Sequence, residues 1–265
     1  MTKIEAEFKK PKMLIGGEFV DSASGETFES RNPATGEHLA DIPRGQPEDI
    51  DRAVEAAKDA QEVWYTEFTA KERGDIVREY ADLLRAHADR LGAIDAADGG
   101  NPVSMMQGDP EAAAELAEIF GGAAMEIKGD TIPVSNDTLD YTIRQPYGVV
   151  GRIVPFNHQA FFAAGKIAAP LVAGNAVVLK PPEQASLSAL ELGRIVTEAD
   201  LFPDGLLNIV PGFGDEAGSP LVGHEDVHKV GFIGSVDTAK LIQKQAAETV
   251  SESILELGGK NPCLV

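Results

Sequence analysis

The polar side chains that could support chemistry follow apolar runs in the second half of the sequence. Lys180 and Glu183 come at the end of AVVLK and shortly after it, and Asn157 follows GRIVPF. Glu256 lies near the end of SILEL, just before two glycines. A lysine at such a place could bind ribose or phosphate, or could mark the solvent end of a sheet. Glu256 could be a general base with a raised pKa or a surface carboxylate. We expect a nucleotide site beside a reaction site.

The segment 146–183 contains the elements that must position most of these side chains. It is typical of a buried strand, a loop turning on Asn157, an apolar helix, a Gly-Asn turn and a second buried strand. Two β-branched strands joined through a helix form a βαβ unit, which predicts a parallel sheet with both faces covered. Both polar loops then follow the carboxyl ends of strands, where open α/β sheets bind ligands.

The first half of the sequence predicts hairpins followed by helices. Residues 13–42 show short alternating runs interrupted by glycine and proline pairs, as hairpin turns require. From Pro47 the apolar period becomes helical, and Thr69 to Glu72 matches a capping box. A further helix is expected over 110–127. Residues 138–144 alternate with period two and predict a strand with one solvent-facing side.

From residue 147 onward the unit of strand, loop and helix repeats. Strands are expected at 206–210, 229–233 and 253–257, and Ser235 suits the N-cap of a helix. Three glycines after the first of these strands, at positions 212, 214 and 218, would open a helix and bring backbone N–H groups near an anion. Their spacing is not G-x-G-x-x-G, and alone such glycines more often mark a tight turn.

The charge of the 265-residue chain is strongly acidic. Asp plus Glu total 43 against 23 Lys plus Arg, a formal net charge of −20. Such a surface repels nucleic acid and anionic membranes, and no basic cluster compensates, so neither is expected as a partner. A solvated acidic coat is the simplest interpretation, and adaptation to high salt is one hypothesis for its origin.

The cysteine, histidine and apolar residues of the sequence bear on disulfides, metal sites and cellular location. Cys263 is the one cysteine, which excludes an internal disulfide and favours a reducing, intracellular environment. The five histidines lack metal-site spacing, so no metal is expected. The first 13 residues have no signal-peptide core, and no apolar run is long enough to span a membrane. We therefore expect a soluble, cytoplasmic protein.

Taken together, four motifs make a specific pattern. They are PFN at 155–157, AGNAVVLKPPE at 173–183, GFIGS at 231–235 and LELGGKNP at 255–262. In this order and at these intervals they resemble the aldehyde dehydrogenase superfamily, and the likeness extends over nearly the whole chain. It implies an α/β fold with a Rossmann-type parallel sheet, covering helices, N-terminal hairpins and helices, and an oligomerisation strand.

The resemblance also implies a division of the chain. Residues 1–137 would form hairpins and helices that pack on the cofactor domain, and 138–146 an oligomerisation-arm strand. Residues 147–265 would form an incomplete NAD-binding domain, with the catalytic domain absent. A full-length enzyme would be a homo-oligomer, either a dimer or a tetramer.

The family chemistry assigns roles to the polar residues. A cysteine thiolate attacks the aldehyde, and by resemblance the side-chain amide of Asn157 stabilises the oxyanion. Hydride passes to the nicotinamide, and Glu256 resembles the base that activates water to hydrolyse the thioester. Lys180 and Glu183 resemble the pair that holds the adenosine ribose. Because a carboxylate there would repel a 2′-phosphate, NAD is expected rather than NADP.

The remaining cofactor contacts implied by the resemblance surround this pair. They are Ile153, Val154, Pro155, Phe156, Gly212, Phe232, Gly234, Ser235, Leu257 and Gly258.

The sequence departs from the family pattern at the reaction site. His158-Gln159 replaces the common Phe-Pro, Phe156 stands where Trp is frequent, and Ile233 where Thr is usual. In the family the nucleophile lies some tens of residues beyond LELGGK. Cys263, in a segment that resembles the next buried strand, is not expected to be that nucleophile.

The chain is therefore interpreted as a truncated enzyme that would not oxidise aldehydes alone. Two alternatives remain: an inactive dinucleotide-binding or scaffolding protein, and an acylating enzyme that releases the thioester to coenzyme A. Glu256 argues against the acylating type, which needs no hydrolytic base.

Overall fold

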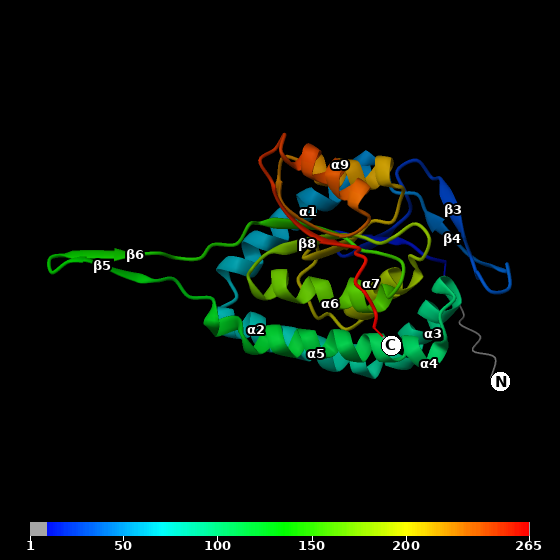
Figure 1. Ribbon diagram of the computed structural model, residues 1–265, viewed down its shortest axis with the longest axis horizontal. Coiled ribbons are helices and arrows are strands. Elements are labelled where there is room, and N and C mark those ends of the chain that lie inside the picture. The colour runs from blue at the N-terminus through cyan, green and yellow to red at the C-terminus, as the bar shows by residue number, and fades with distance from the viewer. Residues whose placement is uncertain (1–9, 265) are drawn as a thin grey trace.

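Within residues 10–264, which the computed structural model describes, seven strands form the central sheet in the order β11-β10-β7-β8-β9-β1-β2 (Figure 1). Five neighbours are parallel: β11 (Glu252–Leu257), β10 (Val227–Gly234), β7 (Val149–Ile153), β8 (Ala176–Lys180) and β9 (Leu207–Ile209). Antiparallel β1 (Met13–Ile15) and β2 (Glu18–Val20) complete it. The predicted parallel α/β sheet is confirmed, and the first hairpin extends this sheet through β9.

The βαβ unit expected at the centre of the chain is present as β7, α6 (Gln159–Val172) and β8. Every residue of β8 is buried, which explains its continuous apolar run. After α6 the chain turns at Gly174, whose φ of 88° favours glycine. The Asn175 side-chain oxygen then accepts hydrogen bonds from the backbone N–H groups of Tyr147 and Gly148, at 2.6 and 3.1 Å. This turn fixes the start of β7 against the start of β8.

Helices cover both faces of the sheet (Figure 1). One face carries α1 (Pro47–Thr66), α8 (Ser219–Gly223) and α9 (Val236–Ala246). The other carries α6 and α7 (Leu187–Glu198). An outer layer lies beyond α6 and contains α2 (Ala70–Ala86), α3 (Ala88–Gly99), α4 (Val103–Met106) and α5 (Gly108–Gly122). None of the helices in residues 10–264 is long and apolar enough to cross a membrane.

Local signals in the sequence explain several helix boundaries. The capping box predicted at α2 is confirmed, since the Thr69 side chain accepts from the Glu72 N–H and the Glu72 carboxylate accepts from the Thr69 N–H at 2.8 Å. The helix expected over 110–127 ends earlier, at Gly122, and a short 3-10 turn η1 (Ala124–Glu126) follows.

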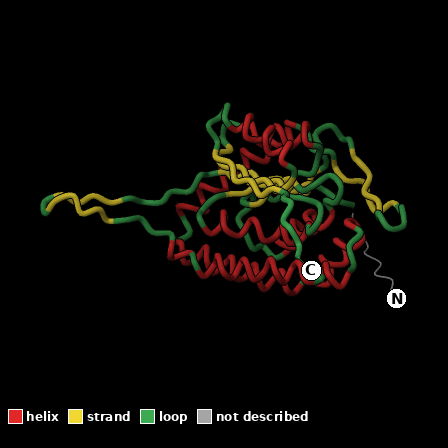
Figure 2. The backbone as a smooth tube through the Cα atoms, in the orientation of Figure 1, coloured by secondary structure: helices red, strands yellow, loops and turns green. Residues whose placement is uncertain are grey.

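Two hairpins lie outside the central sheet. β3 (Thr27–Arg31) pairs with β4 (His38–Pro43), and β5 (Thr131–Ser135) pairs with β6 (Thr138–Tyr141). The second hairpin projects far from the body of the protein, and all of its strand residues are exposed (Figures 1 and 2). The strand expected over 138–144 thus ends at Tyr141 and has β5 as a partner, which the alternation pattern did not reveal.

Candidate functional site

A cavity of about 650 Å³ lies at the carboxyl ends of β7, β8 and β10. Its walls come from the loops after these strands, from α8 and α9, and from the turn η2 (Gly214–Gly218). The structure brings eight of the predicted cofactor-binding residues together in its lining: Ile153, Val154, Pro155, Phe156, Lys180, Glu183, Phe232 and Gly234. The volume lies in the range of small-molecule sites.

Lys180 supplies a buried positive charge to this cavity. Only 3% of the residue is exposed, and its Nζ donates to the Pro181 carbonyl at 3.0 Å and to the Glu183 carboxylate at 3.4 Å. Burial lowers the pKa of Lys180, while the charge of Glu183 opposes this shift. An ammonium has three N–H donors, and two of them are used by these contacts, so within residues 10–264 one donor remains for a ligand oxygen. The Glu183 side chain is 32% exposed and can accept from ligand hydroxyls. A vicinal diol, such as that of a ribose, fits this donor and acceptor pair.

The rest of the lining is mainly apolar or small and fits the other parts of a nucleotide. Phe232 and Val222 are buried at its floor, with Leu241 and Ile242 beside them on α9. Polar groups that converge on the cavity include Asp215, Thr238 and Gln245, none of which the sequence motifs had indicated. Thr238 and Gln245 are on the predicted helix α9, and Asp215 is in the glycine-rich turn after β9, which were their only signals in the sequence. A dinucleotide therefore fits the residues present.

Four predicted cofactor residues lie outside the lining. Gly212 packs behind the cavity, where an added Cβ would lie 2.9 Å from both the Ala217 Cβ and the Gly45 carbonyl oxygen. Ser235 caps α9, with its Oγ accepting from the Thr238 N–H at 3.2 Å. Leu257 and Gly258 are exposed at and beyond the end of β11. For Gly212 and Ser235, the structure shows packing and capping contacts.

Asn157 lies in an exposed loop whose backbone is held from the outer helices. Its carbonyl accepts a hydrogen bond from the Asn101 side chain at 3.0 Å. The next residue, His158, contacts the Asp109 carboxylate through Nδ1 at 3.0 Å. Two residues further on, the Ala160 N–H donates to Asp95 at 2.8 Å. The segment between α3 and α5 therefore fixes the start of α6 and leaves the Asn157 side chain exposed.

Burial changes the ionisation of these carboxylates. Desolvation raises the pKa of Asp95 to about 7. It also raises the pKa of Asp109, which the contact with His158 partly offsets. A further carboxylate, Asp98, accepts from the first N–H of α7, that of Leu187, at 2.9 Å, and desolvation raises its pKa to about 6.

Glu256 is exposed on β11 and forms an ion pair with Lys166 of α6, Nζ to Oε1 2.7 Å. Like Asn157 it is outside the cavity lining, although Asn157 directly follows Phe156 and Glu256 is in register with Ile233, both of which line the cavity.

Cys263 is exposed, and residues 258–264 form no strand. The expectation of a buried strand there is wrong for the part of the chain described here, because the segment has no neighbouring strand to pair with. No cluster of three metal-binding side chains occurs within residues 10–264.

Comparisons with known proteins show which family this chain resembles. The model of the "Aldehyde dehydrogenase family" matches residues 19–265. A putative aldehyde dehydrogenase of Bacillus subtilis is 42% identical over 254 residues, which cover 95% of this chain and 51% of that protein. The aldehyde dehydrogenase family 2 member C4 of Arabidopsis thaliana is 41% identical, over 98% of this chain and 52% of that one. The chain thus spans about half the length of these relatives.

Solved structures show the same relationship. An aldehyde dehydrogenase from Bacillus cereus, solved as an NAD+ complex, superposes with a TM-score of 0.93 and 43% identity, over 99% of this chain and 54% of that one. HpcC from Thermus thermophilus superposes with a TM-score of 0.93 and 40% identity, over 97% of this chain and 50% of HpcC.

Proposed function

The chain belongs to the aldehyde dehydrogenase family, and we propose that it supplies the NAD site of an enzyme that oxidises an aldehyde to a carboxylate. The observation that carries this proposal is the pair of Lys180 and Glu183 at the cavity. The buried ammonium of Lys180 can donate one further hydrogen bond, and the partly exposed carboxylate of Glu183 can accept hydrogen bonds. Together these groups suit the two hydroxyls of an adenosine ribose. When bound, the nicotinamide would accept the hydride.

Glu183 also supports the choice of NAD over NADP. Its carboxylate and that of Asp215 both line the cavity, against the single ammonium of Lys180 among the described lining residues. A 2′-phosphate would add about two negative charges next to this carboxylate. The proposed preference is therefore electrostatic and should weaken when Glu183 is made neutral.

The catalytic roles are proposed for the full enzyme. Asn157 would donate its side-chain N–H to the oxyanion formed when a cysteine thiolate attacks the aldehyde. Glu256 would take a proton from the water that hydrolyses the thioester, with the ammonium of Lys166 next to it. Because the chain spans half of its relatives' length, the nucleophile would lie in sequence beyond these residues.

Self-association is proposed through the hairpin of β5 and β6. Large apolar side chains are exposed on and next to it: Ile132, Val134, Leu139, Tyr141 and Ile143. An isolated two-stranded hairpin is marginal in water, so a second copy that covers these side chains would stabilise it.

Calorimetric titration of the purified 265-residue chain with NAD+ and with NADP+ tests the cofactor assignment. We expect NAD+ to bind more tightly, Lys180→Met to weaken both, and Glu183→Gln to narrow the difference between them. Absence of NAD+ binding to a folded chain would overturn the assignment.

Addition of an aldehyde to the same samples tests the role of Cys263. No NADH should form. Formation of NADH that is lost in Cys263→Ser would show that this cysteine is the nucleophile after all.

A further inference from the structure

The turn that closes one side of the cavity is held within itself by backbone hydrogen bonds, since the Ala217 and Gly218 N–H groups both donate to the Phe213 carbonyl, at 2.9 and 3.3 Å. Residues 211–218 connect β9 to α8 and include η2, whose N-cap residue Phe213 makes no side-chain capping hydrogen bond. A Cβ added at Gly214 would have no other atom within 4 Å, so this position faces open space. Gly214, Asp215 and Gly218 nevertheless line the cavity. A glycine-rich turn has high conformational freedom, so contacts from outside the turn should add to its stability.

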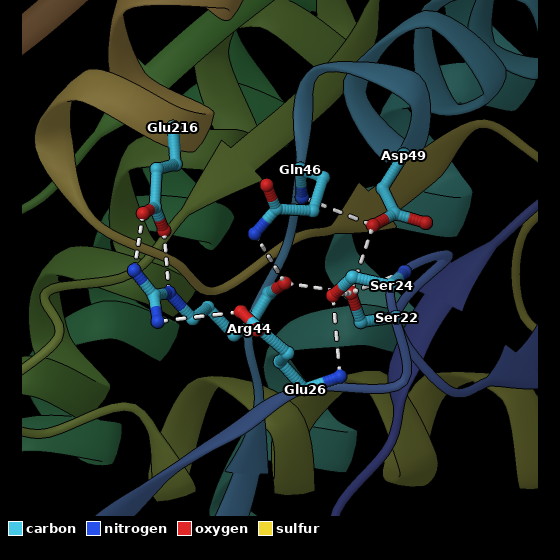
Figure 3. Close-up of polar contacts among 7 residues, drawn as sticks. All are labelled: Ser22, Ser24, Glu26, Arg44, Gln46, Asp49 and Glu216. Carbon is cyan, nitrogen blue, oxygen red and sulfur yellow. Dashed lines mark hydrogen bonds and ion pairs between the residues drawn. The ribbon is translucent and has the colours of Figure 1, made fainter.

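Arg44 contacts this turn from the other end of the sequence (Figure 3). Its Nε donates to Glu216 Oε2 at 2.7 Å and its Nη2 to Oε1, which makes a two-point contact. The guanidinium also lies over the Phe213 ring, 5.0 Å from the centroid. Next to it, the Gly45 N–H donates to the Pro211 carbonyl at 2.9 Å. Residues 44 and 45 therefore hold the turn at three points.

Arg44 itself contacts a polar network that includes the buried residues Ser22 and Asp49 (Figure 3). Its carbonyl accepts from the Ser22 hydroxyl at 2.6 Å and from the Gln46 side chain at 3.1 Å. Asp49, which is fully buried, accepts from the Gln46 N–H at 3.0 Å. The guanidinium makes a further ion pair with Glu26, 3.3 Å away. The N-terminal segment thus holds the backbone of Arg44 through two hydrogen bonds and its guanidinium through a further ion pair.

Charge gives this contact a second consequence. The turn carries two adjacent carboxylates, and Asp215 lines the cavity whereas Glu216 does not. The hydrogen bond from Arg44 holds the pKa of Glu216 below its usual value, so the side chain is ionised. A dinucleotide is an anion, and an unpaired Glu216 carboxylate near the cavity would repel it. Pairing with Arg44 both neutralises this carboxylate and keeps it turned away.

We propose that Arg44 is a positioning residue for the dinucleotide, acting through Glu216 and Phe213 on the turn 211–218. It does not line the cavity, and the inference rests on the proposed function of that cavity. The apparent affinity of a ligand falls in proportion to the fraction of molecules whose site is competent. Because the contact of Arg44 with Glu216 is two-point and charge-assisted, its loss should let the turn adopt an alternative conformation.

The test measures NAD+ affinity by calorimetry in variants of the 265-residue chain. Arg44→Ala should weaken binding by roughly three- to tenfold. Glu216→Gln should weaken binding less, because it loses the contact but also removes the carboxylate that would repel the dinucleotide. Arg44→Lys should recover part of the loss, because a lysine replaces the charge but not the planar fork. The exchanged pair Arg44→Glu with Glu216→Arg should bind more tightly than either of its single variants.

Arg85→Ala is the matched control. Arg85 on α2 also donates two hydrogen bonds, one to Glu111 and one to Glu118 on α5, and none of these residues lines the cavity. Its replacement should leave NAD+ affinity unchanged. Amide hydrogen exchange should accelerate in residues 213–218 of Arg44→Ala but not in those of Arg85→Ala.

The outcomes separate the two proposals. If the wild-type chain does not bind NAD+, the proposed function fails and this inference falls with it. Suppose instead that the wild type binds NAD+. If Arg44→Ala then binds it equally well, or if Arg85→Ala loses as much NAD+ affinity as Arg44→Ala does, only the role of Arg44 is refuted. Should Arg44→Ala fail to fold, Glu216→Gln and Arg44→Lys decide by the same criteria.

Discussion

The carboxylate of Asp95 on α3 accepts the hydrogen bond of the Ala160 N–H on α6, three residues after Asn157. Asp95 is fully buried, and its second oxygen has no hydrogen-bond partner within the described residues. The start of α6 gains an acceptor for one of its unpaired N–H groups, which is where a negative charge is most favourable. The burial of this carboxylate away from water disfavours its ionised form.

The first prediction concerns the pH dependence of stability that follows from this burial. The pKa of Asp95 is raised from 3.8 to about 7 in the folded protein by desolvation. Between these values the folded state binds more protons than the unfolded chain, so the free energy of unfolding falls as the pH rises. Each unit of pKa difference corresponds to about 1.4 kcal/mol. Asp98, with its pKa raised to about 6, adds to the same trend.

Urea unfolding at a series of pH values from 5 to about 8 would measure this slope. Asp95→Asn keeps an oxygen for the Ala160 N–H but cannot ionise, so its stability should vary less with pH than that of the wild type. Asp82→Asn, at a side chain that is 83% exposed, is the control and should keep the wild-type slope. Equal slopes in Asp95→Asn and the wild type would contradict the raised pKa.

The parallel sheet could be predicted from sequence because its signal is local. Runs such as AVVLK are buried on both sides and alternate with helices, so Lys180 was expected at the end of a strand. The contact of Arg44 with Glu216 could not be predicted, because it joins residues 172 positions apart through tertiary packing alone. The buried strand expected around Cys263 is not present in residues 258–264, since a strand needs a neighbour and nothing in residues 10–264 pairs with that segment. The prediction that Cys263 is not the nucleophile stays a prediction.

The second prediction concerns the contact of His158 with Asp109 at the start of α6. Asp109→Ala removes the partner of Nδ1, so the residues before α6 lose one of their anchors on α5. Amide exchange should accelerate at Phe162, whose N–H donates to the His158 carbonyl at 3.0 Å. It should not change at Ala173, at the far end of the same helix.

Glu111→Ala is the control for this variant. Glu111 lies on the same helix as Asp109 but is exposed and pairs with Arg85. It should leave the exchange of Phe162 at the wild-type rate. If Asp109→Ala does so as well, His158 does not help to hold this loop.

The third prediction concerns the close approach of α2 and α5. A Cβ added at Gly121 would lie 2.8 Å from the Gly74 carbonyl oxygen, and one at Gly74 would lie 2.6 Å from the Gly121 carbonyl oxygen. Because these contacts are with backbone, the helices would have to separate. Gly121→Ala should therefore lower the free energy of unfolding by about 1–3 kcal/mol, as overpacking does.

The neighbouring residue provides a matched control for the measurement by urea unfolding. Gly122 is also in α5, but a Cβ there meets nothing within 4 Å. Gly122→Ala should be neutral or slightly stabilising, because alanine favours a helix more than glycine does. Similar destabilisation of both variants would mean that helix separation is not the cause.

The fourth prediction concerns the net charge of −20. Like charges on the surface oppose the compact state, and dissolved salt screens this repulsion. The melting temperature should therefore rise with KCl concentration. Screening is nearly complete at molar salt, where the Debye length is about 3 Å. A rise that continues beyond that point would need another source, such as the hydrated acidic coat expected of a protein adapted to high salt.

A variant with a smaller charge separates the two contributions. Glu55, Asp59 and Glu62 are exposed on α1, and their replacement by the corresponding amides removes three negative charges without altering the core. This variant should melt higher than the wild type at low KCl, and the difference should shrink as screening increases. If the acidic coat acts through hydration, the order should reverse at molar KCl, because amides bind water and cations less strongly than carboxylates. A melting temperature that falls steadily with KCl would rule out adaptation to high salt.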